Sequence, residues 1–446
     1  MKKSIFFAAL AVVVLGACTK NEVTYNTTPE AVAFGGYSGR TITKAGATID
    51  MNLENLKTEG FGVFATYSGT NDYAEATNDF MYNQDVKYSG SAWTYSPIKY
   101  WPNPTNGSSA DAQKVSFFAY APYCQPAATE EFGIMGFEID GTTKHNIVNY
   151  GFKSGVPNVD LLWGYKQGAT LTDTNIDEDV NINLTRTAET VKFAFRHSLS
   201  KLAGSQEGDP GTDGTNANGL IIKADPTADP TNGFATDNGT KITVSKIVVK
   251  SAEKDLNDNT ITYAADGSVQ TGKLDLYTGK FTLDAAVEPI KFEQTLVAGT
   301  PAAGENELAD NLKEVASPAS FAAVNPGVKK TPQNVYKNEV NPIILIPGSK
   351  PVVEVEVTYV VRTYDEKLGT KKFSEVPQTV YGKIAFPEIE SNKKYNICII
   401  IGLNDVKFAA TVDDWTTGGP VDTNGDGVID ANDTVGTVNV YLPKNL

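Results

Sequence analysis

The feature that most constrains this chain is the dominance of strand-type segments and the scarcity of any helical period. Val, Ile, Tyr, Phe and Thr concentrate in eight segments, at 60–69, 114–123, 160–167, 191–199, 241–251, 351–364, 393–403 and 406–415. In one of them, Val191, Phe193 and Phe195 share one face of a period-two pattern. Clusters of Gly, Asn, Asp and Pro separate the segments, and only 318–324 is compatible with a helical turn or two. This pattern predicts an all-β fold of antiparallel sandwiches.

The N-terminus has the organisation of an export signal. Two lysines precede an apolar run from Ile5 to Leu15, and the small residues Gly16 and Ala17 follow. Such a run is too short to span a bilayer, so residues 1–17 are predicted to be a secretory signal peptide. The sequence LGAC resembles the lipobox of bacterial lipoproteins, which implies cleavage before Cys18 and acylation (palmitate) of that cysteine. Residues 18–30 are polar and are expected to form a lipidated tether.

Length and cysteine content limit the domain organisation. The 446 residues are too many for one ordinary core and favour two domains, which we place at 31–188 and 189–446. Export permits a disulfide between Cys124 and Cys398. However, Cys398 lies inside the apolar run YNICIII, which favours a buried free thiol.

Charge and motif content exclude two classes of function. The formal net charge of −15 argues against nucleic acid, whose phosphates would be repelled. The chain has two histidines, and it contains no nucleophile, zinc or phosphate-loop signature, so we predict that it is not an enzyme. Trp93 and Trp101 lie in an aromatic-rich stretch. Core packing is the commoner use of such rings, and a stacking platform for a glycan is the alternative.

A calcium loop is predicted near the C-terminus, at 422–433. Its spacing supplies oxygen ligands at loop positions 1, 3, 5, 7, 9 and 12, and Gly427 stands where the sharp turn needs glycine. The expected ligands are Asp422, Asn424, Asp426, the carbonyl of Val428, Asp430 and Asp433. Asp at the last position resembles dockerin-type loops. The flanking segments 406–415 and 435–443 read as strands, so the metal is expected to be structural calcium joining two strands.

Several motifs together resemble the fimbrillin family of type V pilins. They are AVAFGGYSGRTITKA, GFGVFATYSG, FMYNQDVKYSGSAWTYSPIKYWPN, KVSFFAYAPY, VKFAFRHSLSKL and YNICIIIGLNDVKFAATVDDW. The resemblance implies two tandem transthyretin-like β-sandwich domains and export as a lipoprotein to the outer-membrane surface. It also implies that an Arg-specific protease removes a first strand near the N-terminus. A strand from another subunit then fills the vacated groove, and the subunits polymerise into a fimbrium.

Arg40 is the residue that fits this processing step. It is the only arginine before position 186, and it follows a short apolar strand with Val32 and Phe34 on one face. Cleavage between Arg40 and Thr41 would expose a sheet edge that can accept another strand.

The predicted function is therefore a stalk, tip or anchor subunit of a type V fimbrium, located first on the outer membrane and then in the extracellular fimbrium. The expected partners are other fimbrial subunits, the processing protease, the outer membrane through the lipid, and a ligand on a host or bacterial surface. Two alternatives stay open. The first concerns the tail, because residues 435–446 either act as the donor strand or complete their own sandwich. The second concerns the whole chain, which is either a fimbrial subunit or a non-polymerising surface lipoprotein that binds glycan.

Overall fold

The computed structural model confirms an almost entirely β protein, with 51% of residues in strands and 5% in helices. It describes residues 30–37, 51, 53–103, 108–126, 132–153, 158–169, 171, 176–187, 189–202, 219–224, 239–284, 289–314, 317–337, 343–402, 406–414 and 440–442. Within these residues the α-helices are α1 (Leu53–Glu59) and α2 (Ile176–Asp179), and none is long and apolar enough to cross a membrane. The helical turns expected at 318–324 reduce to one 3₁₀ turn, Phe321–Ala323. A second 3₁₀ turn is Ser109–Asp111.

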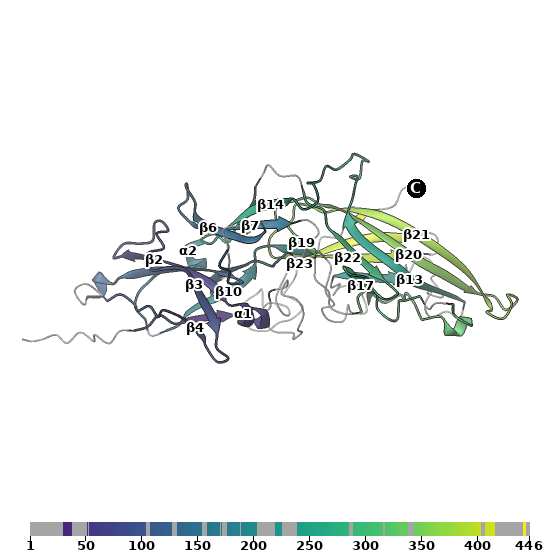
Figure 1. The fold of residues 1–446 in the computed structure, drawn as a ribbon, viewed down its shortest axis with the longest axis horizontal. Helices are drawn as coiled ribbons and strands as arrows, with labels where there is room; N and C mark the ends of the chain where they lie inside the picture. Colours follow the sequence, from purple (N-terminus) through teal and green to yellow (C-terminus); the bar gives the residue numbers. More distant parts are fainter. Residues whose placement is uncertain are drawn as a thin grey trace, which may run out of the picture.

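The first half of the chain builds an eight-stranded sheet (Figure 1). Its main path runs β1 (Phe34–Tyr37), β10 (Val191–His197), β8 (Leu162–Lys166), β5 (Lys114–Ala121), β2 (Phe61–Gly69), β3 (Met81–Tyr88) and β4 (Trp93–Tyr95), and β9 (Asn181–Leu184) pairs with β5. All pairs on this path are antiparallel except that between β1 and β10. β1 is therefore the end strand of this path, and it forms the one parallel pair on it.

A four-stranded sheet covers one face of this first sheet. Its order is β15 (Phe281–Leu283), β14 (Val269–Asp275), β7 (Asn146–Lys153) and β6 (Gly133–Ile139). Side chains from both sheets, such as Phe64 and Trp163 of the first and Tyr150 and Phe281 of the second, share one buried cluster. The sheet thus combines strands from distant parts of the sequence.

The second half of the chain forms a sandwich of two further sheets, on the right in Figure 1. One contains β18 (Gln333–Asn334), β12 (Leu220–Ala224), β22 (Lys393–Ile401), β11 (Ser200–Leu202), β19 (Ile343–Leu345), β23 (Val406–Asp414) and β24 (Val440–Leu442). The other runs β17 (Glu305–Glu307), β16 (Glu293–Val297), β13 (Thr240–Ser251), β20 (Val352–Tyr364) and β21 (Phe373–Ala385). Their inner faces enclose the largest apolar cluster, which is rich in Val, Ile and Leu.

The sheets do not follow the predicted division at 188/189. β10, which that division assigns to the C-terminal domain, pairs with β1 and β8 of the first sheet. β14 and β15 pair within the sheet of β7. Long-range strand pairing of this kind leaves no mark in local composition. The identity of the two halves as tandem transthyretin-like domains stays a prediction.

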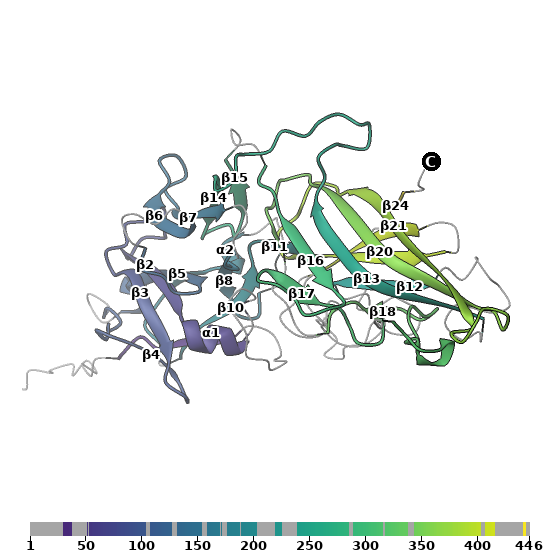
Figure 2. The same cartoon turned by 45° about the vertical axis from the view of Figure 1, so that its right-hand side comes forward.

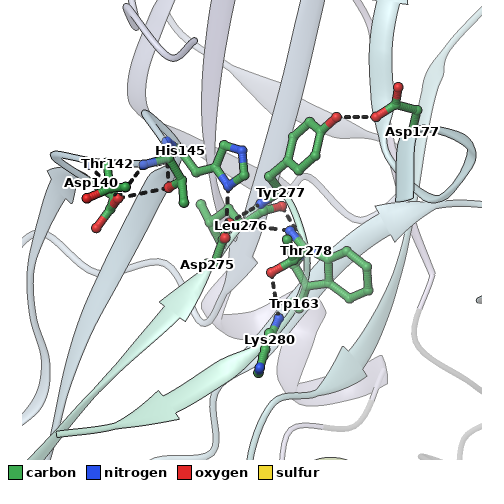
Figure 3. A network of polar contacts seen from close by, with 11 residues as sticks. Asp140, Thr142, His145, Trp163, Asp177, Asp275, Leu276, Tyr277, Thr278 and Lys280 are labelled. Carbon is green, nitrogen blue, oxygen red and sulfur yellow. Dashed lines mark hydrogen bonds and ion pairs between the residues drawn. The ribbon is translucent and has the colours of Figure 1, made fainter. Parts of the chain in front are cut away.

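The turn between β14 and β15 is fixed against the first half by a polar and aromatic network (Figure 3). His145 Nδ1 lies 2.9 Å from Asp275 Oδ2, and the His145 ring stacks on Tyr277 with centroids 4.3 Å apart. The Tyr277 hydroxyl donates to Asp177 of α2. Trp163 of β8 donates its indole N–H to the carbonyl of Leu276 at 2.9 Å. The hairpin therefore acts as a strap from the second half onto the first.

Arg362 is a fully buried cation in the C-terminal sandwich. Its guanidinium lies 2.6 Å from Glu314 and 2.8 Å from Glu375, and it donates to the Thr243 hydroxyl at 2.8 Å. Only 1% of the arginine side chain is exposed. A buried charge of this kind is tolerated because each of the three guanidinium nitrogens donates to a side-chain oxygen.

Candidate assembly site at the N-terminal strand

The segment from Glu30 to Tyr37 closes a seam between two parts of the first half. On one side, Phe34–Tyr37 pairs in parallel with Val191–Ala194 of β10, and the Val191 N–H donates to the carbonyl of Ala33 at 2.8 Å. On the other side, the segment meets residues 99–101. The Val32 N–H donates to the Lys99 carbonyl, and the Trp101 N–H donates to the Glu30 carbonyl, each at 2.9 Å. The short segment thus has backbone partners on both flanks.

The inward side chains of this segment belong to the core. Val32 is 1% exposed and Phe34 is 4% exposed, whereas Ala31 and Ala33 face solvent. This alternation is what the sequence pattern predicted for Val32 and Phe34, and the structure confirms it. The Phe34 ring lies among aromatic rings whose centroids are 5.2 to 6.5 Å away, namely those of Tyr95, Phe117, Phe193 and Phe61.

Tyr95 of β4 holds the segment through both its hydroxyl and its ring. Its hydroxyl donates to the Val32 carbonyl at 2.9 Å and accepts from the Lys99 N–H at 3.2 Å. Burial raises the pKa of this hydroxyl above its usual value, so the group stays neutral and keeps its proton for donation. The same ring packs on Phe34, so one side chain holds both the backbone and the core residue of the segment.

An ion pair marks the start of the segment. Arg186 Nε lies 3.1 Å from Glu30 Oε2, and the same guanidinium donates to Asn103 at 2.5 Å. Both charged side chains keep about a fifth to a third of their surface exposed, at 22% and 29%. A pair of this exposure contributes about 1 kcal/mol or less. The apolar side chains, not the charges, dominate the seating of the segment.

Removal of the segment would open a groove with defined chemistry. Burying a Val or a Phe side chain contributes about 1.5–3 kcal/mol each, so Val32 and Phe34 together contribute about 3–6 kcal/mol. Their loss would expose the rings beneath them and leave the Val191 N–H, the Lys99 carbonyl and the Trp101 N–H unpaired. A groove that combines apolar pockets with unpaired backbone groups fits an extended strand with alternating apolar side chains.

Several predicted site residues lie outside the described residues. These are the lipidation residue Cys18, the cleavage residues Arg40 and Thr41, and the loop 422–433 with all of its expected calcium ligands. The described strand β1 ends at Tyr37, three residues before Arg40 in the sequence. A cut after Arg40 would therefore separate all of β1 from the rest of the chain.

The aromatic residues considered for glycan stacking are packed against the core. Trp101 is 4% exposed and its ring lies 5.6 Å from that of Phe117. Trp93 is half-buried, with its ring 5.0 Å from Phe61 and 5.3 Å from Tyr88. The packing role, which the sequence favoured for both rings, is the one observed.

The histidines and cysteines belong to the fold. The His145 side chain is mostly buried and contacts Asp275. His197 ends β10 and lies 2.6 Å from Asp160 in a fully buried pair. Cys124 and Cys398 are free thiols. Within the described part of the chain, no group of three or more metal-ligating side chains gathers.

The described part of the C-terminal tail lies at another sheet edge. Val440–Leu442 forms β24, which pairs antiparallel with Ala410, Ala409 and Phe408 of β23. Three residue pairs are a short ladder, and β24 has β23 as its one partner among the described strands. In this state the tail extends its own sheet.

Comparison with known proteins identifies a related family. The fimbrillin-like family model matches residues 43–244. The fimbrium subunit Fim1C of Phocaeicola vulgatus is 29% identical over 119 residues, which cover 26% of this chain and 29% of that protein. The chain thus aligns with less than a third of this relative's length. The relatives found are fimbrial or adhesion proteins and not enzymes.

Solved structures agree with this relationship at the level of the fold. The crystal structure of a fimbrial protein from Bacteroides vulgatus aligns with 86% of this chain and 99% of its own, at 16% identity and a TM-score of 0.50. The crystal structure of a protein from Bacteroides uniformis ascribed to cell adhesion also aligns with 86% of this chain and 99% of its own, at 16% identity and a lower TM-score of 0.34. The first likeness shows a shared fold over most of the chain.

Proposed function

We propose that this protein is a structural subunit of a surface fimbrium, and that subunits join by strand exchange at the seam that β1 occupies. The single observation that carries the proposal is the seat of β1. It is a short edge strand with two buried side chains, it lies entirely before Arg40, and it is the one parallel strand on the main path of the first sheet. The fimbrillin-like match over 43–244 supports the same reading.

The exchange follows from the chemistry of the seam. A protease that cuts between Arg40 and Thr41 makes residues up to 40 a separate peptide, held only by noncovalent contacts. When that peptide leaves, the groove between β10 and residues 99–101 needs a strand with apolar side chains two residues apart. Because each subunit then offers a groove to one neighbour and a strand to another, the contacts do not close and a filament results.

The C-terminal segment 435–446 is the donor that the sequence offers. Val438, Val440 and Leu442 alternate as Val32 and Phe34 do, so two of them can take the buried positions in a neighbour's groove. β24 pairs with its own β23 through only three residues, which makes it a strand that can be released. The alternative, that the tail remains in its own sandwich, predicts that truncation after Trp415 leaves polymerisation unchanged.

Calcium and lipid have supporting roles in this proposal. The loop 422–433 carries the oxygen ligands of a calcium site directly before the tail, and metal there would shorten and orient the approach to residues 435–446. Acylation at Cys18 would hold the precursor on the outer membrane, and cleavage after Arg40 would release it to the fimbrium.

The substitution Arg40→Ala tests this cleavage step. Protein harvested from the surface should then keep its acylated N-terminus, which N-terminal sequencing and mass spectrometry will detect.

A reversible staple tests the exchange step directly. Gly35 and Lys192 are register partners, and a Cβ built on Gly35 lies 3.5 Å from Lys192 Cγ, which suits a disulfide. The variant Gly35→Cys/Lys192→Cys, made with Cys124→Ser and Cys398→Ala, is cut with an Arg-specific protease. When oxidised it should stay monomeric on gel filtration, and dithiothreitol should restore SDS-resistant ladders.

The matched control is Lys192→Cys alone in the same Cys124→Ser/Cys398→Ala background, which should polymerise with or without reductant. If the oxidised double variant forms ladders as readily as this control, the seat of β1 is not where subunits join.

A further inference from the structure

A second docking site lies at the junction of the two halves, away from the β1 seam. A cavity of about 680 Å³ opens there. Its walls come from β7, β14 and β15 of the four-stranded sheet on one side and from β16, β17 and β19 on the other. Figure 2 shows β15, β11, β16 and β17 close to this junction. Its volume is within the range of sites that bind ligands in proteins.

The cavity lies against the edges of strands and not against their faces. Ile343, Ile344, Leu345 and Ile346 all line it in succession. Side chains alternate along a strand, and Ile344 packs in one core whereas Leu345 packs in the other. All three residues of β19 line the cavity together with Ile346, which follows the strand, and this is expected when the strand turns its backbone edge toward the cavity. The same reasoning applies to Gly304, Glu305 and Asn306, which also line the cavity in succession.

The edge of β19 is open on this side. β19 ends its sheet and pairs with β11, and none of the described strands pairs with its other edge. β15 and β17 also end their sheets, although the Glu307 carbonyl of β17 is covered by the Lys337 N–H at 3.0 Å. Exposed strand edges in proteins are normally covered or blocked, because they template pairing with another chain. Here three sheet edges line a single cavity.

The charges around the cavity favour an acidic ligand. Lys153, Lys291 and Lys350 line it, against Glu293 and Glu305. Both carboxylates already accept hydrogen bonds within the fold, from the Thr295 hydroxyl at 3.3 Å and from the Ala302 N–H at 2.9 Å. Lys350 pairs with Glu388 only at an exposed position, where an ion pair contributes little. Lys153 and Lys291 also lie over the rings of Phe132 and Tyr263, and the lining as a whole carries three ammonium groups against two carboxylates.

We propose that this cavity binds an extended segment of another polypeptide, which adds as a strand to β19. The segment would alternate small apolar and polar side chains and carry carboxylates at its ends, facing the rim lysines. Its apolar side chains would contact the wall formed by Ile261, Ile290 and Phe292. Three residues of β19 give a ladder of about two or three hydrogen bonds, so the site suits a short strand. This inference does not depend on strand exchange at β1.

The test uses the full uncleaved protein and a labelled peptide, Glu-Val-Thr-Val-Thr-Val-Glu, capped at both ends. Fluorescence anisotropy should show saturable binding, and hydrogen–deuterium exchange should slow at 343–346 and 304–306. Methylating the three valine nitrogens and methylating the two threonine nitrogens block opposite edges of the peptide. One of these two peptides should lose at least tenfold in affinity, and the other should bind nearly as the parent does.

Charge reversal locates the site independently. Lys291→Glu/Lys350→Glu should weaken binding at least tenfold, because both lysines are exposed and line the rim. Lys371→Glu, an exposed lysine at the far hairpin, is the matched control and should change nothing. The proposal fails if no saturable binding occurs, or if both methylated peptides bind as the parent does. It also fails if exchange slows instead at 191–194 and 99–101, since the peptide would then occupy the β1 seam.

Discussion

Truncation of the Phe34 ring should measure how firmly β1 is seated. The ring is 4% exposed and contacts four other aromatic rings of the same core. Replacement of a buried Phe by Ala generally costs about 3–5 kcal/mol, from lost transfer energy and from the cavity left behind. We therefore expect Phe34→Ala to lower the free energy of unfolding of the uncleaved protein by about 3–5 kcal/mol. Because β1 is an edge strand, the neighbouring side chains can partly fill the cavity left by the ring, so we expect a loss near the lower end, about 3 kcal/mol.

The assay is urea unfolding of a soluble form that begins at Thr19, followed by tryptophan fluorescence. Ala33→Ser is the control, because Ala33 lies on the exposed face of the same strand and should change stability by about 0.5 kcal/mol or less. The same two variants are compared after cleavage at Arg40 and removal of the released peptide, where residue 34 is gone and the difference must vanish. A loss below about 1 kcal/mol for Phe34→Ala would refute the claim that this ring anchors the strand.

The same substitution has an opposite effect on assembly. A loss of about 3–5 kcal/mol in seating weakens retention of the cleaved peptide by about two to three and a half orders of magnitude, at 1.4 kcal/mol per tenfold. Cleaved Phe34→Ala protein should therefore form ladders sooner than the wild-type protein does. A variant that is destabilised yet polymerises more slowly would separate the core role of Phe34 from release of the strand.

Three other changes test separate parts of the chain. Glu314→Ala/Glu375→Ala should destabilise the protein by about 3–5 kcal/mol in urea, since it leaves the buried Arg362 cation without its carboxylate partners, whereas Lys371→Met should not. Burial raises the pKa of Cys398 to about 11, so its stabilising contribution is complete below the usual thiol pKa and is lost as pH rises toward 11. The stability difference between wild type and Cys398→Ala should therefore shrink or reverse between pH 8 and pH 10.5. Asp426→Ala should abolish calcium binding in titration calorimetry, with Asp266→Ala as the control.

The central strands were predictable because a buried strand carries a strong local pattern of apolar residues in the sequence. β2, β5, β8, β10, β20, β22 and β23 fall within the predicted segments, and β13 begins one residue before its segment. β21 was not predicted, although it is 13 residues long and pairs fully with β20. As an edge strand it exposes Val376 and Tyr381 and contains Pro377, so it lacks a clean alternation. Helix α1 is also too short to show a period.

The candidate site was predictable on one side only. Val32 and Phe34 reveal a buried face through their spacing, and the sequence pattern found them. The partners that form the seat, β10 and residues 99–101, lie far away in the sequence, and parallel pairing of β1 with β10 has no local signal. The cavity at the junction of the two halves was not predictable for the same reason. The edge of β19 becomes a cavity wall only because β15 and β17, which are distant in the sequence, lie beside it.

A subunit that gives up a strand must keep the rest of its fold, and the topology explains how this chain can. β1 pairs only with β10 among the named strands, and β10 retains β8 on its other side, so loss of β1 does not interrupt the sheet. The strap at 275–280 fixes the second half onto β8, α2 and the turn before β7, none of which pairs with β1. Chain continuity from β10 to β11 makes a further link between the halves. Force along a filament would thus pass through contacts that cleavage leaves intact, and the groove would open without separating the halves.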